Sequence, residues 1–155
     1  MGRAPILTAI NNAKTSVDLV IYGLTDERCI RALINAKNAG KNVRVLLEPQ
    51  PYKHADENTA AIQQLQTASV TLPAPNPIFR FTHQKTLITD QQQAIVMTFN
   101  FTHATFDRER NFALIITDPA EVNEINQVFQ ADQLQHQPTC ERRRNRVMSG
   151  CYTGR

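Results

Sequence analysis

Residues 17–47 read VDLVIYGLTDERCIRALINAKNAGKNVRVLL, in which two apolar runs flank one helical pattern. The runs Val17–Tyr22 and Val43–Leu47 predict buried strands because they are short, compact and almost entirely apolar. Between them, Thr25 is the predicted N-cap of a helix, and Gly40 is its predicted C-terminal stop. Two strands that are joined by a helix and short connections are typical of a parallel pair in an α/β sheet.

The flanking sequence extends this α/β pattern in both directions. We expect a short amphipathic helix over 6–13 before it, and a helix over 55–67 and a short strand over 69–72 after it. Prolines 73, 75 and 77 then mark a surface loop. Further strands are predicted over 86–89, 94–98 and 112–117, and Asp118-Pro119 opens a last helix. The predicted fold is one α/β domain over residues 1–131, a mixed sheet flanked by helices, with a polar and basic tail over 132–155 that we expect to be flexible.

The positive charge of the chain is concentrated at its C-terminal end. The 155 residues carry 17 Lys and Arg against 14 Asp and Glu, a net charge of +3. Residues 141–155 contribute five of these basic residues and one acid, which leaves 12 basic and 13 acidic residues in the first 140. The body is therefore nearly neutral, which does not favour a basic groove that tracks a nucleic-acid backbone.

The sequence predicts neither a bound metal nor a cofactor. The cysteines are odd in number and form no CxxC pair, which favours reduced thiols over a disulfide framework or a zinc site. No cluster of metal ligands and no targeting signal is recognisable, and no apolar run is long enough to cross a membrane. We therefore expect a cytoplasmic protein.

The segment after the proline loop contains the most informative polar residues. Residues 81–90 read FTHQKTLITD, so that His83 and Lys85 are two residues apart and Asp90 follows after four intervening residues. In an extended strand, residues two apart point to the same face. An imidazole beside a fixed ammonium is suited to attack on an anionic phosphorus, because the ammonium offsets the developing charge. Asn100 and the Thr98 hydroxyl would donate further hydrogen bonds to phosphate oxygens if the next strand lies alongside.

This pattern resembles the phospholipase D superfamily, whose signature is HxKxxxxD followed by a GSxN-like segment. The resemblance extends from about Ala9 to Ala131 and implies a phospholipase D-like fold with one HKD half-site per chain. It implies that His83 is a nucleophile that forms a covalent phosphohistidine, and that Lys85 and Asn100 bind phosphate. Asp90 matches the motif carboxylate, which we expect to support the site without touching phosphorus. The implied mechanism uses no metal and no cofactor.

Two positions depart from the family pattern. Met97 and Thr98 stand where relatives usually have Gly and Ser; Thr98 keeps the hydroxyl, but Met97 adds bulk where glycine allows close backbone approach. Many relatives also place a glutamate downstream that holds the nucleophilic imidazole. The matching position here is Asn111, with Glu109 two residues earlier on the same strand face. Asn111 would orient the ring, but it would not stabilise an imidazolium as a carboxylate does.

The remaining histidines and phenylalanines receive structural interpretations. His54, His103 and His136 have no lysine two residues on and are expected at the surface. The phenylalanines in or beside predicted strands are expected in the core rather than on a base-stacking platform; they are Phe79, Phe81, Phe99, Phe101 and Phe112.

The single HKD motif has a consequence for assembly. The family mechanism needs two histidines, one as nucleophile and one as general acid. Either two copies form an isologous homodimer with one shared site, or the chain is half of a longer protein with two motifs. We favour the homodimer.

The sequence alone is compatible with more than one class of substrate. The resemblance implies a phosphodiesterase, and the nearly neutral body favours a phospholipid, with peripheral membrane contact, over DNA or RNA. A metal-independent endonuclease is the first alternative. A non-catalytic module that binds phosphate or lipid is the second, because of Met97 and Asn111.

Overall fold

The computed structural model describes residues 2–135, which form five strands and five helices. Their order along the chain is α1 (Arg3–Asn12), β1 (Ser16–Ile21), α2 (Glu27–Asn38), β2 (Asn42–Leu47), α3 (Thr59–Thr67), β3 (Thr86–Thr89), β4 (Gln93–Met97), α4 (His103–Arg108), β5 (Ala113–Ile116) and α5 (Pro119–Gln133). The basic part of the predicted tail, residues 136–155, lies outside the described residues.

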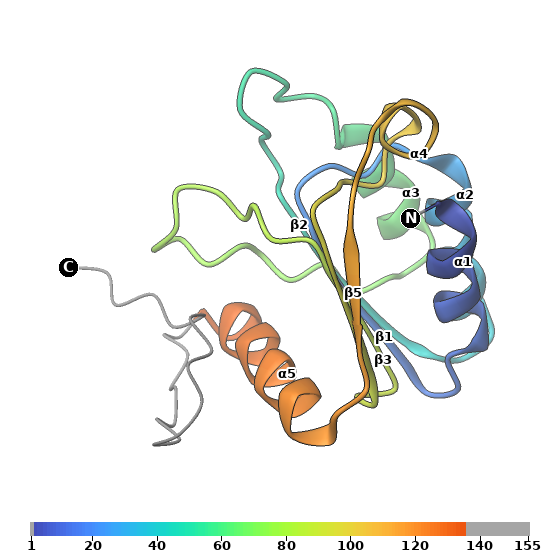
Figure 1. Cartoon of the computed structure of the whole chain (residues 1–155). Coiled ribbons are helices and arrows are strands. Elements are labelled where there is room, and N and C mark those ends of the chain that lie inside the picture. The colour runs from blue at the N-terminus through green and yellow to red at the C-terminus, as the bar shows by residue number, and fades with distance from the viewer. Residues whose placement is uncertain (1, 136–155) are drawn as a thin grey trace.

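The strands form one mixed sheet in the order β2-β1-β3-β4-β5. β1 and β2 are parallel, with Val17 opposite Val43, while the other neighbours are antiparallel. Helices α1, α2 and α3 cover one face of the sheet and α5 lies against the other (Figure 1). The predicted parallel pair, the predicted strands over 86–89 and 94–98, which pair with each other, and the mixed α/β fold are therefore confirmed.

Alternation along the strands divides the apolar side chains between two cores. The larger core joins α1, α2 and α3 to one face of the sheet, through residues such as Ile10, Leu33 and Leu19. The smaller core joins α5 to the other face, through Phe129 and Ile88 among others. Side chains alternate between the faces because the strand period is two residues. No helix among residues 2–135 is long and apolar enough to cross a membrane.

Several predicted boundaries were wrong for local reasons. α2 begins after Asp26, not Thr25, because the Asp26 carboxylate accepts the Cys29 amide. α3 begins at Thr59, four residues later than predicted. The segment 69–72 forms only an isolated bridge between Thr71 and Arg44. The short helix α4, capped by the Thr102 hydroxyl, was not predicted.

The predicted strand 112–117 is real, but Phe112 at its start was wrongly expected in the core. β5 is the edge of the sheet, and its side chains are covered only in part. Phe112 is 65% exposed and Leu114 is 63% exposed. Phe99 and Phe101 are buried as predicted, whereas Phe79 is exposed and was wrongly placed in the core.

Candidate active site

His83 lies immediately before β3, at the edge of the sheet where the parallel strands β1 and β2 end. This is the carboxyl edge of the parallel pair, where ligands of α/β sheets commonly bind. The His83 side chain is exposed, and its ring packs edge-on against Tyr22, which follows β1, with centroids 4.7 Å apart. The chain thus presents an accessible imidazole against a fixed aromatic wall.

Lys85 is buried behind His83 and braces it. Its ammonium donates a 2.6 Å hydrogen bond to the His83 carbonyl oxygen and lies 5.4 Å from the centroid of the Tyr22 ring. Burial lowers the pKa of Lys85 to about 8, because desolvation disfavours the charged ammonium. Burial, and then the Lys85 charge, also lowers the pKa of His83, which favours a neutral imidazole at neutral pH.

Asn100 approaches the same edge of the sheet from the segment after β4. Its Oδ1 accepts a hydrogen bond from the Gly23 amide at 3.1 Å. Because an amide N–H requires an acceptor, this contact fixes the side-chain amide with its oxygen toward Gly23, so that Nδ2 is the donor end. A Cβ at Gly23 would lie only 3.2 Å from Asn100 Cγ, so the absence of a side chain there permits this approach.

Gly23→Ala is therefore expected to lower phosphodiesterase activity about tenfold, because the new methyl group displaces the Asn100 amide. The measurement is kcat/KM on a phosphodiester, with Gly2→Ala as the control, since a Cβ at Gly2 meets nothing within 4 Å. Equal activity of Gly23→Ala and the wild type would show that catalysis does not depend on the position of the Asn100 amide beside Gly23.

Thr98, Asn111 and Glu109 form a connected hydrogen-bond chain at the end of β4. The Thr98 hydroxyl donates to Asn111 Oδ1 at 3.1 Å, and Asn111 Nδ2 donates to Glu109 Oε2 at 3.1 Å. Thr98 is also paired with the backbone of Phe112. The structure therefore brings together these three residues of the predicted site. Glu109 is exposed and joins this chain of hydrogen bonds through Asn111.

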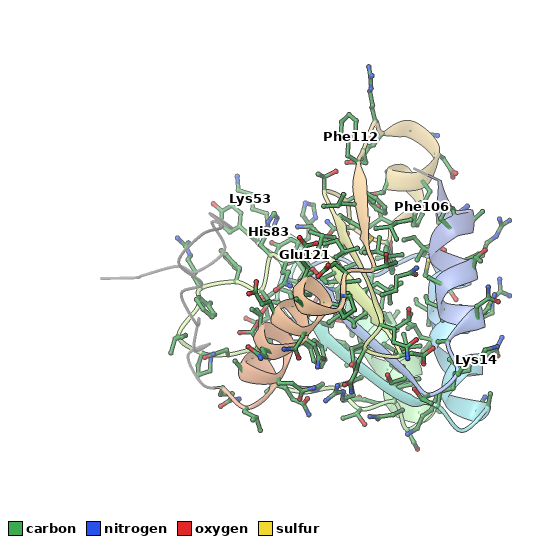
Figure 2. The ribbon with its side chains drawn as sticks, turned by 60° about the horizontal axis from the view of Figure 1, so that its bottom comes forward. Lys14, Lys53, His83, Phe106, Phe112 and Glu121 are labelled. Carbon is green, nitrogen blue, oxygen red and sulfur yellow. The ribbon has the colours of Figure 1, made fainter. Side chains whose placement is uncertain are left out.

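Asp90 lies at the opposite end of β3 from His83. Its carboxylate accepts the amides of Lys14, Thr15 and Ser16 at 2.7–3.0 Å, and the Thr15 hydroxyl at 2.9 Å. Seven extended residues span roughly 20 Å, and Figure 2 shows Lys14 far from His83. Asp90 was expected to support the site without touching phosphorus, but its observed contacts anchor the entry to β1 instead.

Glu48 and Asn58 shape the site, although the sequence did not single them out. Glu48 follows β2 and is buried; its Oε2 accepts the Thr82 amide at 2.8 Å, directly before His83. Asn58 is fully buried and donates to the carbonyl oxygens of Tyr22 and Glu48, while its Oδ1 accepts the Leu24 amide. A charged residue directly after a buried strand was the available signal for Glu48.

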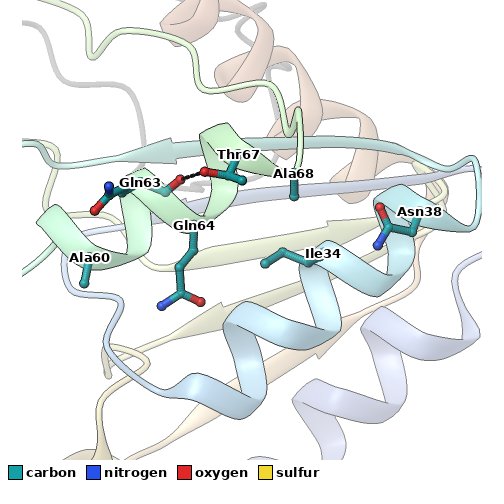
Figure 3. A pocket seen from close by; sticks show the side chains of 7 residues that line it. All are labelled: Ile34, Asn38, Ala60, Gln63, Gln64, Thr67 and Ala68. Atoms are coloured by element: carbon teal, nitrogen blue, oxygen red, sulfur yellow. Dashed lines mark hydrogen bonds between the residues drawn. The ribbon is translucent and has the colours of Figure 1, made fainter.

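A depression elsewhere on the surface does not match this chemistry. It lies between α2 and α3 and is lined by residues such as Ile34, Gln63 and Gln64, with no charged side chain (Figure 3). An anion would find no cation there. Nor does any group of three or more His, Cys, Asp or Glu side chains in residues 2–135 lie where it would hold a metal ion.

Comparison with known proteins identifies the family of this chain. A family model described as the PLD-like domain of cardiolipin synthase matches residues 6–133, which include every residue of the candidate site. The chain belongs to the phospholipase D-like family. Within this family, the chain is 31% identical over 113 residues to a phospholipase D from Rickettsia conorii, and 29% identical to one from Rickettsia prowazekii.

Both comparisons cover 73% of this chain. They cover 54% and 53% of the two relatives, so the phospholipase D-like chain spans about half the length of the curated proteins it matches.

Two solved structures share the fold of this chain. The family member Nuc from Salmonella typhimurium superposes with a TM-score of 0.78 at 24% identity, over 90% of this chain and 91% of Nuc. NucT from Helicobacter pylori gives a TM-score of 0.75 at 16% identity, over 85% and 87% of the two chains. The predicted phospholipase D-like fold is therefore confirmed.

Proposed function

We propose that this phospholipase D-like protein hydrolyses the phosphodiester bond of a phospholipid through a covalent phosphohistidine at His83. The observation that carries the proposal is the convergence of an exposed imidazole, a buried ammonium and an oriented amide on one edge of the sheet. The phospholipase D names of the curated relatives support the choice of lipid.

In the first step, a neutral nitrogen of His83 attacks phosphorus. A P–N bond forms as the bond to the headgroup oxygen breaks, and a general acid protonates that oxygen. Lys85 and Asn100 Nδ2 donate to the phosphate oxygens and stabilise the charge that develops on them. In the second step, water attacks phosphorus, the P–N bond breaks and phosphatidic acid leaves. The histidine that served as the general acid now accepts the proton from water.

The second histidine is assigned to another copy of the chain. In residues 2–135, His54 and His103 are exposed on other elements, and neither has a lysine two residues on. His136 lies outside the described residues. A homodimer in which each copy contributes His83 supplies both the nucleophile and the general acid.

An apolar patch beside the site is suited to this dimer. Val96, Phe112 and Leu114 are exposed and share the face of the sheet that α5 packs on, beyond the part that α5 covers. Thr98 is on the same face, because it pairs with Phe112. The patch therefore borders the candidate site, and a symmetric contact across it brings two sites toward each other.

Leu114→Asp is expected to weaken this dimer by about 3 kcal/mol. In a symmetric interface both copies carry the substitution, so two carboxylates are buried on association. Activity should then fall with dilution, and sedimentation should show monomers. Ile115→Asp is the matched control, since Ile115 is the next residue along the edge strand and points to the opposite face. A fully active Leu114→Asp monomer would contradict the shared site.

The pKa of Lys85 predicts a falling alkaline limb in the pH profile. Below about pH 8 the ammonium is protonated and binds phosphate; above it, the charge is lost and kcat/KM should fall. Lys85→Arg retains a cation at high pH, so the residual activity of this variant should decline only at higher pH. An alkaline limb that stays in place in Lys85→Arg would assign it to another group.

The substrate proposal is tested by one assay with two substrates. The purified full chain is incubated in EDTA with vesicles of labelled phospholipid and, in parallel, with plasmid DNA. We expect phosphatidic acid from the vesicles and intact plasmid. Nicked plasmid with intact lipid would establish the endonuclease instead, and binding of either substrate without turnover would establish the non-catalytic module.

A further inference from the structure

Two loops meet beside His83 and form one continuous surface. The first runs from β2 to α3 and contains Tyr52; the second runs from α3 to β3 and contains Phe81. The Tyr52 and Phe81 rings lie edge to face with centroids 6.1 Å apart, and Phe81 also packs against Tyr22, the residue that contacts His83. In Figure 1 both loops extend from the sheet on the side away from α1.

This surface, which we call the rim, consists of Tyr52, Lys53, Ile78, Phe79, Arg80 and Phe81. Its apolar members are unusually accessible for large side chains: Tyr52 is 57% exposed, Ile78 54% and Phe79 45%. Such side chains are normal when scattered singly, but grouped around a catalytic edge they mark an interaction surface.

Cations accompany the aromatic rings of the rim. The Arg80 guanidinium lies 5.2 Å from the centroid of Phe81, and the Lys53 ammonium lies 5.3 Å from that of Tyr52. Each pair combines an apolar body with a positive tip, as side chains at a membrane interface do.

The first loop is held in place rather than merely extended. The Tyr52 amide donates to the hydroxyl of Tyr22. Lys53 has a φ of +63°, a conformation that lysine adopts only where its surroundings impose it. The Lys53 ammonium lies over the ring of Tyr52, whose backbone amide is bonded to Tyr22, the residue that contacts His83.

We infer that the rim docks the protein on the surface of a phospholipid bilayer. This inference rests on the proposed function and deepens it, because it states how the site reaches its substrate. Ile78 and Phe79 enter the boundary of the acyl chains, while Lys53 and Arg80 contact lipid phosphates above them. The match is one of charge and polarity, since a bilayer stacks a layer of phosphates on an apolar layer.

A nucleic-acid strand fits the rim less well. Single-stranded nucleic acid is bound by aromatic rings within an extended cationic groove. Ile78 offers no ring for a base to stack on, and the first loop carries Asp56 and Glu57 as well as Lys53. With so little net charge on the two loops, apolar contact has to provide most of the binding.

Docking through the rim positions the catalytic group. Only Thr82 separates Phe81 from His83, and the Thr82 amide is fixed by the buried Glu48. The imidazole is therefore at the level of the lipid headgroups when Ile78 and Phe79 are inserted below them. The phosphodiester bond of a phospholipid lies at this same level.

The test compares substitutions at exposed apolar side chains inside and outside the rim. The full chain and its Ile78→Asp/Phe79→Asp variant are sedimented with vesicles of phosphatidylcholine containing phosphatidylglycerol. We expect binding of the variant to weaken at least about tenfold, with lipid hydrolysis falling in parallel. Hydrolysis of a water-soluble diester, bis-p-nitrophenyl phosphate, should remain unchanged. Leu134→Asp, at a residue that is 62% exposed beyond α5, should bind vesicles like the wild type.

The outcomes separate the two proposals. Wild-type vesicle binding in Ile78→Asp/Phe79→Asp would overturn the docking inference even if the lipid is hydrolysed. The same would follow if this variant lost affinity for a single-stranded oligonucleotide while it kept its affinity for vesicles. Rim-dependent vesicle binding by a protein that hydrolyses neither lipid nor diester would support docking and contradict the proposed function.

Discussion

His83→Ala is expected to abolish phosphodiester hydrolysis, with a loss of at least about a thousandfold, because it removes the imidazole that we propose as the nucleophile. The stability of the protein should change little, since the His83 side chain is exposed and its main contact is one ring packed against Tyr22. The measurements are kcat/KM on labelled phospholipid and the midpoint of urea unfolding for both proteins.

His103→Ala is the matched control for this substitution. His103 is also exposed, but it lies at the start of α4, where its imidazole is 3.8 Å from Asp107. This variant should keep full activity. Wild-type protein denatured in alkaline detergent, in which a phosphohistidine is stable, should retain label from a substrate with radioactive phosphorus, and His83→Ala should retain none. Label that survives in His83→Ala would place the covalent intermediate on a different residue.

Asp90→Ala is expected to destabilise the fold by about 3 kcal/mol, because three amides and one hydroxyl lose their shared acceptor. Asp90 also has a φ of +54°, which aspartate tolerates better than alanine. The substitution frees the entry to β1, the strand that lies between β2 and β3. Asp90→Asn should lose less stability, because asparagine keeps one acceptor oxygen and tolerates the same backbone conformation.

The pH dependence of stability gives this prediction a second measurement. The hydrogen bonds from Lys14, Thr15 and Ser16 outweigh desolvation and lower the pKa of Asp90 to about 2. A carboxylate whose pKa falls on folding stabilises the protein above its unfolded pKa, about 3.9, and this stability is lost as the pH falls toward 2. The free energy of unfolding of the wild type, measured in urea, should therefore fall between about pH 4 and about pH 2. Asp90→Asn should lack this fall. Identical acid sensitivity in both proteins would contradict this role.

The parallel pair was predictable because its signal is local and repeated. Val17–Tyr22 and Val43–Leu47 are strongly apolar, and a helix lies between them. A helical connection is typical of two parallel strands, whereas antiparallel neighbours can be joined by a tight turn. The exposure of β5 was harder to predict. Its apolar sequence resembles that of a buried strand, and only the order of the strands shows that it lies at the edge of the sheet. α4 was missed because its six residues offer too few turns to display a period.

The proximity of His83 and Lys85 was predictable because it depends only on their spacing along the chain. His83 and Lys85 lie together as a two-residue step requires, although Lys85 also turns back to the His83 carbonyl oxygen. Asp90 shows the limit of the same reasoning, since an extended chain carries neighbours in a motif far apart. Glu48 and Asn58 act through backbone groups of distant segments. The position of Glu48 directly after a buried strand was a local signal, but no local pattern marks Asn58.

The hydrogen bond from the Thr82 amide to Glu48 fixes the chain between the exposed loop and His83. Residues 77–80 of the loop before Thr82 are exposed and can be exchanged, while the carboxylate of Glu48 continues to set where the chain enters β3. A redesigned loop that preserves Thr82 and the Phe81 ring should therefore be able to present the same imidazole to a different surface. Substitutions in the exposed part of the loop should therefore change the surface that the protein contacts without moving His83, as long as the contact between Glu48 and the Thr82 amide is kept.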